Sequence, residues 1–142
     1  MENQDCIFCK ILRKEIPSAK IFENDKFYAF LDMSPVNFGH TLIIPKEHTE
    51  TMITAKSTTL REMMPIAKKI ATAVMKYQKA DGFNLCINNC KAAGQLVPHM
   101  HIHIIPRFEA DSVTIDKQKT KKYIPGEMEK LAVKLGEIIY SM

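Results

Sequence analysis

Short apolar segments separated by turn residues recur along the chain, and five of them have the length and alternation of β-strands. The first two come close together around Asn24-Asp25, which is typical of a hairpin. The pattern predicts strands over residues 19–22, 27–31, 40–44, 83–88 and 99–105.

Between the third and fourth predicted strands, apolar positions follow the spacing of an amphipathic helix. Thr59 and Glu62 have the spacing of a capping box at its start. Because Pro65 removes a backbone hydrogen bond, we expect the helix to kink there or to begin nearby. The apolar face consists of Leu60, Met63, Met64, Ala67, Ile70, Ala71, Val74 and Tyr77.

A second helix is predicted over residues 126–141, where Pro125-Gly126 supplies a start signal. Because the strands and helices do not alternate regularly, their order indicates an α+β fold with a five-stranded, mainly antiparallel sheet, a long central helix and a C-terminal helix. We expect a single domain over residues 1–142. The apolar face of the second helix consists of Met128, Leu131, Ala132, Leu135, Ile138 and Ile139.

The composition narrows the class of protein. A chain of 142 residues with 46% hydrophobic content can bury one core, and no apolar run is long enough to span a bilayer. The polar start, residues 1–5, lacks the pattern of a signal peptide, so we expect a cytoplasmic protein. A net charge of +4 suits an anionic ligand but is too small to indicate nucleic acid. The basic run Lys117–Lys122 is interpreted as a solvated loop.

The cysteines are expected to be reduced thiols rather than a disulfide framework, because the cytoplasm is reducing. Cys6 and Cys9 form a C-x-x-C pair, the spacing of half a tetrahedral zinc site. Two buried thiols near the N-terminus are the simpler alternative. Cys86 and Cys90 have a different spacing and are interpreted as structural.

The run His99-Met100-His101-Ile102-His103 carries the strongest chemical signal. Alternate residues of a strand share a face, so the pattern predicts three imidazoles in a row on one face. Imidazole acts as a nucleophile, as a general acid or base, or as a metal ligand near neutral pH. Packing alone is therefore a weak explanation for three of them.

The segment before this run, residues 88–98, is polar and contains Gly94, so its backbone amides could face an anion. From Gly94-Gln95 through the three histidines to Arg107, the chain resembles the signature of the histidine triad (HIT) family of nucleotide hydrolases and transferases. Earlier blocks also match, so the resemblance covers a core of about residues 6–107. The blocks that carry it are Cys6–Ile11, Glu15–Ser18, Ala29–Pro35 and Gly39–Lys46.

The resemblance is closest to the small histidine-triad nucleotide-binding proteins and implies a homodimer with joined sheets and one purine nucleotide site per subunit. It implies that His101 attacks the α-phosphorus and forms a nucleotidyl-histidine intermediate, which water hydrolyses. His103 and His40 would stabilise the phosphate. The remaining phosphate contacts would come from Asn88, Gly94 and Gln95.

Further roles follow from the same resemblance. Asp32 would accept hydrogen bonds from the ribose hydroxyls, although a turn residue before Ser34-Pro35 is the simpler interpretation. Leu96 occupies a position where many members have serine, threonine or an acidic residue, so help to the leaving group is reduced. Five apolar residues match the family's base-packing wall, although each could equally be core: Ile7, Phe8, Ile11, Phe22 and Phe30.

Similarity to bacterial zinc-containing members implies that His48 and His99 complete a structural zinc site with Cys6 and Cys9. His101 would then remain free of metal. The zinc would hold the histidine strand in register, since a ligated His99 is fixed by the metal.

Three functions stay open at this point. The first is an enzyme of the phosphoramidase type that cleaves phosphoramidates, aminoacyl adenylates or dinucleoside polyphosphates, or transfers the nucleotidyl group. The second is a module that binds a nucleotide or a partner, with incidental turnover. The third is a hydrolase in which all three triad histidines bind one catalytic metal, a poor fit because same-face strand residues lie roughly 6.5–7 Å apart.

Overall fold

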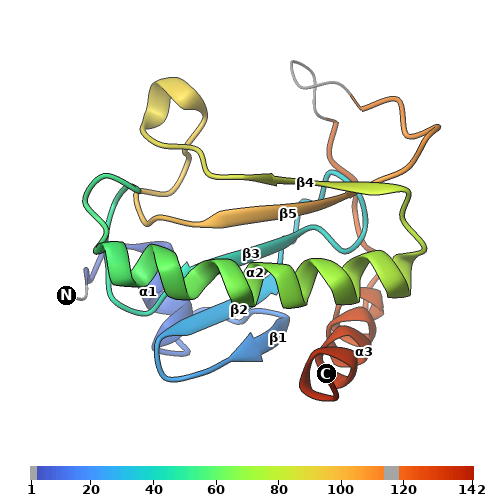
Figure 1. The fold of residues 1–142 in the computed structure, drawn as a ribbon, viewed down its shortest axis with the longest axis horizontal. Coiled ribbons are helices and arrows are strands. Elements are labelled where there is room, and N and C mark those ends of the chain that lie inside the picture. Colours follow the sequence, from blue (N-terminus) through green and yellow to red (C-terminus); the bar gives the residue numbers. More distant parts are fainter. Residues whose placement is uncertain (1–2, 114–118) are drawn as a thin grey trace.

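The computed structural model describes residues 3–113 and 119–142, and a five-stranded sheet runs through its centre (Figure 1). The strands have the order β1-β2-β3-β5-β4, and every neighbouring pair is antiparallel. This confirms the predicted α+β fold. The strands are β1 (Lys20–Glu23), β2 (Phe27–Leu31), β3 (Thr41–Pro45), β4 (Gly82–Cys86) and β5 (Ile102–Arg107). Lys117 of the basic run lies outside the described residues.

One face of the sheet carries the main core. The long helix α2 (Ser57–Gln78) crosses this face, and α3 (Glu127–Tyr140) packs against β1 and α2 (Figure 1). Residues at alternate strand positions point into this core because successive side chains of a strand face opposite ways. The core residues with no exposed surface include Ala29, Ile43, Met63, Ile70, Met100, Ile104, Leu135 and Ile139.

The opposite face of the sheet carries a smaller cluster that the sequence pattern did not reveal. A six-residue helix, α1 (Ile7–Leu12), packs there, and the Cys6 sulfur caps it by accepting from the amide of Cys9. Six residues are too few to show a helical period. The intervening strand residues Phe30, Leu42 and Ile44 complete this cluster.

The predicted start of the long helix is wrong. The helix begins at Ser57 with Lys56 as its N-cap, so Thr59 lies inside the first turn and forms no capping box. Glu62 instead pairs with Lys26 at 2.9 Å. The helix continues through Pro65, eight residues after its first residue.

The predicted strand over residues 99–105 also needs correction, since β5 begins only at Ile102. His99 and His101 therefore lie in the segment that leads into the strand. This segment is fixed by the amide of Met100, which donates to the carbonyl of Thr49 at 2.7 Å. Met100, like Ile102, still points into the main core.

The C-terminal helix confirms its prediction closely, with Gly126 as N-cap in the left-handed region and Glu127 as first helical residue. Among the helices of the described part of the chain, none is long and apolar enough to cross a membrane.

Candidate functional site

The histidines gather on the face of the sheet that α1 covers. His103 of β5 is opposite Leu42 of β3 in the register, and His40 directly precedes β3. Antiparallel pairing thus brings together two histidines that are 63 residues apart. His40 Nε2 lies 2.9 Å from His103 Nδ1.

Backbone partners fix the proton positions of this pair. The amide of Val36 donates to His40 Nδ1 at 3.1 Å, so the proton of neutral His40 is assigned to Nε2. Nε2 then donates to His103 Nδ1. The proton of neutral His103 is consequently on its own Nε2, the nitrogen left for a ligand.

His101 has the opposite arrangement. Its Nδ1 lies 2.7 Å from the carbonyl oxygen of His99, and a carbonyl can only accept, so Nδ1 carries the proton. The lone pair of Nε2 remains available. Rings surround this imidazole, with the centroid of Phe8 at 5.1 Å and that of His103 at 4.8 Å.

Burial keeps these imidazoles neutral at pH 7. Burial, together with a smaller effect of the neighbouring His101, lowers the pKa of His40 to about 4 and that of His103 to about 3. Burial also lowers the pKa of His101, against the opposing effects of the His99 carbonyl and of Asp32. A neutral imidazole has the lone pair that a nucleophile requires.

The position of Asp32 is compatible with both predicted roles, the turn before Ser34-Pro35 and the contact with the ribose hydroxyls. One carboxylate oxygen accepts from the amide of Ser34 at 2.9 Å, which forms the expected turn. The other lies 3.7 Å from His40 Nε2. Partial burial raises the pKa of Asp32, while the Ser34 amide opposes that shift. Asp32 therefore turns the chain and still directs an oxygen toward the histidines.

The loop after β4 brings Asn88 close to Gly94. Gly94 has φ +90°, a conformation that favours glycine, and a side chain there would lie 3.7 Å from the Asn88 amide nitrogen. Within the described residues the Asn88 side chain makes no hydrogen bond, so it is available to a ligand.

The Gln95 side chain does not face a ligand site but bonds to the backbone at both of its ends. Its side-chain oxygen accepts from the amide of Cys90 at 2.7 Å, and its side-chain nitrogen donates to the carbonyl of Glu50 at 2.7 Å. Both ends of the side chain thus join two loops. The Gln95 backbone amide donates to the Cys90 carbonyl at 3.2 Å and the Gly94 amide to the Lys91 carbonyl at 3.0 Å, so neither of these predicted phosphate donors is free.

The expected base-packing residues separate into groups. Phe8, Ile11 and Phe30 belong to the small cluster beneath the histidines, and the Phe8 ring lies against that of Phe30. Ile7 is on the exposed side of α1. Phe22 does not belong with them, because it lies in the main core and stacks on Tyr140.

Leu96 is the departure from the family signature, and the structure leaves it 92% exposed. It lies just after the Cys90–Gln95 loop and contributes no hydrogen-bonding group. An apolar side chain at this place neither donates to nor accepts from a leaving group.

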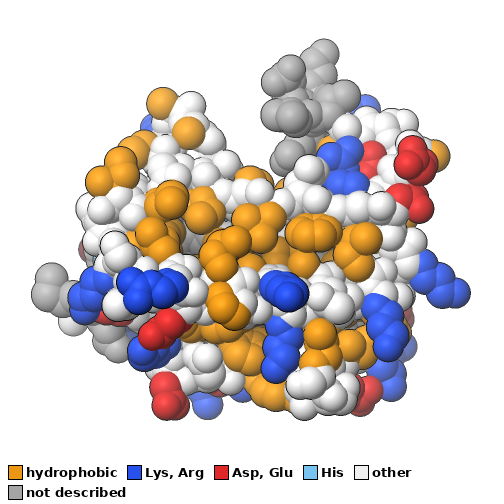
Figure 2. Space-filling model, in the orientation of Figure 1, with side chains coloured by type: hydrophobic (Ala, Val, Ile, Leu, Met, Phe, Trp, Pro, Cys, Tyr) orange, Lys and Arg blue, Asp and Glu red, His pale blue; other side chains and the backbone are white. Residues whose placement is uncertain are grey.

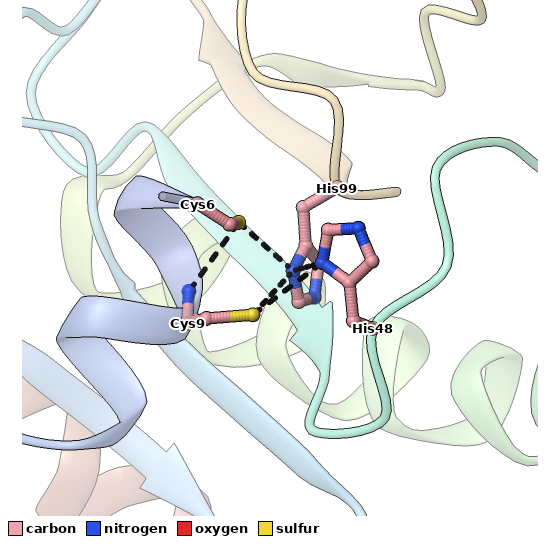
Figure 3. A group of neighbouring side chains, drawn as sticks. All are labelled: Cys6, Cys9, His48 and His99. Atoms are coloured by element: carbon pink, nitrogen blue, oxygen red, sulfur yellow. Dashed lines mark hydrogen bonds between the residues drawn. The ribbon is translucent and has the colours of Figure 1, made fainter. Parts of the chain in front are cut away.

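Figure 3 shows a second group, in which Cys6 and Cys9 of the α1 end converge with His48 and His99. The sulfur-to-nitrogen distances are 3.4 Å for Cys6–His99, 3.4 Å for Cys9–His48 and 3.7 Å for Cys9–His99. The two Nδ1 atoms lie 3.2 Å apart. All four side chains predicted from the sequence are therefore brought together.

These distances fit a tetrahedral zinc ion. With the usual bond lengths, the edges would be roughly 3.5 Å from sulfur to nitrogen and roughly 3.3 Å between nitrogens. His99 donates from Nε2 to the carbonyl of Pro45 at 2.8 Å, which leaves Nδ1 for a metal. Burial lowers the pKa of His99 to about 4, so its ring is in the neutral, ligating form.

The same contacts argue against a metal held by all three triad histidines. The two nitrogens of His99 are directed to Pro45 and to the cysteine group, away from His103. Cys90 is exposed, so the structural role expected for it has no support from packing.

The residues around His40 were missed by sequence reasoning. Val36 supplies the amide that orients the ring, and Tyr123 lies beside the same loop. The only sequence signal was the turn-forming Asn37-Phe38-Gly39 before His40, and no pattern connected it with the C-terminal segment.

Comparisons with known proteins identify a family and several similar proteins. Residues 13–110 match the model of the HIT domain family. A solved structure titled as a Zn-bound histidine triad family protein from Mycobacterium smegmatis superposes with a TM-score of 0.84 and 33% identity, covering 96% of this chain and 94% of that one.

Two curated relatives have names that state an activity. Adenosine 5'-monophosphoramidase HNT1 of Saccharomyces cerevisiae is 46% identical over 107 residues, which are 75% of this chain and 65% of that protein. Adenylylsulfatase HINT3 of Arabidopsis thaliana is 45% identical over 107 residues, 75% of this chain and 54% of that protein. Each relative thus extends beyond the matched region.

The buried, neutral His40 predicts an acid-dependent loss of stability. In the unfolded chain a histidine titrates near pH 6.5, whereas in the folded protein the pKa of His40 is about 4. Between these values the unfolded chain binds more protons, so the free energy of unfolding falls as the pH falls. The contribution of His40 to that loss is about 3 kcal/mol at pH 4.

Urea unfolding of the wild type and of His40→Asn between pH 7 and pH 4.5 measures this effect. The asparagine oxygen can still accept from Val36, so the variant chiefly removes the titrating group. We expect a smaller loss of stability on acidification in His40→Asn. Parallel pH profiles for the two proteins would contradict the assignment of His40 as buried and neutral.

Proposed function

The chain belongs to the HIT domain family, and from this premise we propose that it hydrolyses nucleotides at the α-phosphate with His101 as nucleophile. The supporting observation is the 2.7 Å hydrogen bond from His101 Nδ1 to the His99 carbonyl. It leaves the lone pair of Nε2 available and stabilises the positive charge that the ring gains on attack.

The proposed reaction has two displacements at phosphorus. His101 Nε2 forms a bond to the α-phosphorus, and the leaving group departs with its electron pair and gains a proton. Water then attacks the nucleotidyl-histidine, releases a nucleoside monophosphate and restores the imidazole. Dividing one difficult substitution into two steps lowers the barrier of each.

The neighbouring groups have proposed roles in both steps. His103 donates from Nε2 to a phosphate oxygen, and His40 holds it in that orientation. The Asn88 side chain provides a further donor, and Gly94 and Gln95 shape the loop beside it through their bonds to the Lys91 and Cys90 carbonyls. Asp32 accepts from the ribose hydroxyls, while Phe8, Ile11 and Phe30 form the apolar floor for a purine base.

A fluorogenic adenosine phosphoramidate tests this function. We expect turnover by the wild type and a loss of at least about a thousandfold in His101→Ala, because the nucleophile is removed. Glu129→Gln, an exposed change on α3, is the control and keeps full activity. Rapid quenching of the wild-type reaction should also trap nucleotide on the protein.

Absence of any turnover that depends on His101 would reject the enzyme. It would favour the second candidate, a nucleotide-binding module, which the exposed and apolar Leu96 supports. Adenylyl sulfate and dinucleoside polyphosphates belong in the same panel, since sulfate and phosphate leave without the protonation that an amine needs.

We also propose that Cys6, Cys9, His48 and His99 hold a structural zinc ion. Burial raises the pKa of Cys6, so a metal would have to displace its proton to bind the thiolate. The zinc would supply no chemical step. Through His99 it would fix the carbonyl that orients His101.

Metal analysis of untagged protein provides the test. We expect about one zinc per chain, lost in Cys9→Ser and retained in Cys90→Ser, since only Cys9 belongs to the cluster. Less than a few tenths of a zinc per wild-type chain, or equal zinc in both variants, would rule out this site.

A homodimer joined at the β4 edge is the third part of the proposal. Figure 2 shows hydrophobic side chains gathered over α2 and β4, where a groove of about 720 Å³ is lined by Met64, Met75, Phe83 and Leu85 among others. An exposed apolar face beside an open strand edge is typical of a protein interface.

The other edge of the sheet is already covered. The Tyr140 hydroxyl accepts from the amide of Glu23 on β1 at 3.0 Å, and α3 lies so close that a side chain at Gly136 would be 3.3 Å from the Ile21 carbonyl. These contacts leave β4 as the edge that a second copy would extend.

Sedimentation velocity tests the dimer. Wild type is expected at twice the mass of one chain, and Leu85→Asp at the mass of one, because the charge would be buried in the interface. Val133→Asp changes another exposed apolar residue, on α3, and should remain dimeric. A dimeric Leu85→Asp would contradict the β4 interface.

A further inference from the structure

The segment Lys121–Tyr123, here named the C-terminal strap, lies against the loop between β2 and β3. The amide of Lys121 donates to the carbonyl of Pro35 at 2.6 Å. The hydroxyl of Tyr123 accepts from the amide of Gly39 at 3.0 Å. The strap therefore holds this loop at two points, Pro35 and Gly39.

Between these two points, Phe38 of the loop makes aromatic contacts with the strap. The ring of Phe38 lies 4.8 Å from that of Tyr123, and the Lys121 ammonium is 5.4 Å from the Phe38 ring centroid. Phe38 thus contacts two residues of the strap.

The loop end that Tyr123 holds is the one that positions His40. Gly39 directly precedes His40 and has φ +96°, a turn conformation that glycine adopts readily. The amide of His40 donates to the Asn37 carbonyl at 3.0 Å, and its carbonyl accepts from Asp32 at 2.9 Å. Among the described residues, the hydrogen-bond partner of the Gly39 amide is Tyr123.

The strap itself is anchored by the main core. It runs directly into α3, whose Leu135 and Ile139 have no exposed surface. Burial raises the pKa of Tyr123; the hydrogen bond from the Gly39 amide opposes this shift, and the negative charge of Asp32 adds to it. The hydroxyl therefore stays protonated and neutral across the working pH range.

We propose that Tyr123 is a positioning residue for the proposed hydrolysis: through the Gly39 amide it holds His40, and through His40 the donor His103. The connection runs from the α3 core through Tyr123 and Gly39 to the His40–His103 pair. It gives the C-terminal segment a role at the site. The proposal rests on the proposed function for its kinetic part, but not for its structural part.

Tyr123→Phe is the test variant, because it removes the hydroxyl and keeps the ring against Phe38. Tyr140→Phe is the matched control, since the Tyr140 hydroxyl also accepts from a backbone amide and its ring also stacks on a phenylalanine. We expect kcat to fall roughly tenfold in Tyr123→Phe with little change in KM, and to be unaffected in Tyr140→Phe.

A structural readout makes the test independent of turnover. Long-range proton–nitrogen NMR spectra of the imidazoles should show shifted His40 and His103 ring signals in Tyr123→Phe. The same signals should be unshifted in Tyr140→Phe, and the His48 signals unshifted in both variants.

The proposed hydrolysis and the positioning role of Tyr123 can be rejected independently of each other. A wild type without turnover rejects the proposed function, and the NMR spectra then still decide whether Tyr123 positions His40. Unshifted His40 and His103 signals in Tyr123→Phe overturn the inference, and so does an equal loss of kcat in both variants.

Discussion

The antiparallel pairing of β3 with β5 is the constraint on which both sites depend. At one end of β3, the register that sets Leu42 opposite His103 brings His40 within hydrogen-bond distance of His103. At the other end, the Pro45 carbonyl holds His99 Nε2 and leaves Nδ1 facing Cys6 and Cys9. A shift of register by one residue would reverse the faces and separate both groups.

Backbone groups then assign a different state to each imidazole. The amide of Val36 makes His40 a donor toward His103, while the carbonyl of His99 takes the Nδ1 proton of His101 and leaves the Nε2 lone pair of that ring available. Burial keeps these rings neutral, so they differ by proton position rather than by charge. Equivalent side chains acquire unequal roles because their fixed partners can only donate or only accept.

The two faces of the sheet have different roles, one in stability and one at the site. Its α2 face carries the large core that anchors α3, and its α1 face carries the small cluster beneath the histidines. Several connections cross between elements that are distant in the sequence. Gln95 joins the loop after β4 to Glu50, close to His48, and the strap joins α3 to the loop before β3. The site is therefore held by parts of the chain that contribute no reacting group.

The sequence by itself determined the α+β class and the approximate positions of the five strands and two helices, because periodicity is a local property of the chain. The three triad histidines and the Cys6–Cys9 pair stood out by their spacing, whereas His40, His48 and Asp32 were added by the resemblance to the HIT family. The sequence could not reveal α1, the start of α2 or the start of β5, since a short helix has no visible period and Glu62 is drawn to Lys26 rather than to a cap. Only the tertiary structure separated Phe22 from the floor residues and turned the Gln95 side chain inward. It alone brought Tyr123 to Gly39, because a contact across 84 residues depends on how the core packs and leaves no pattern in either segment.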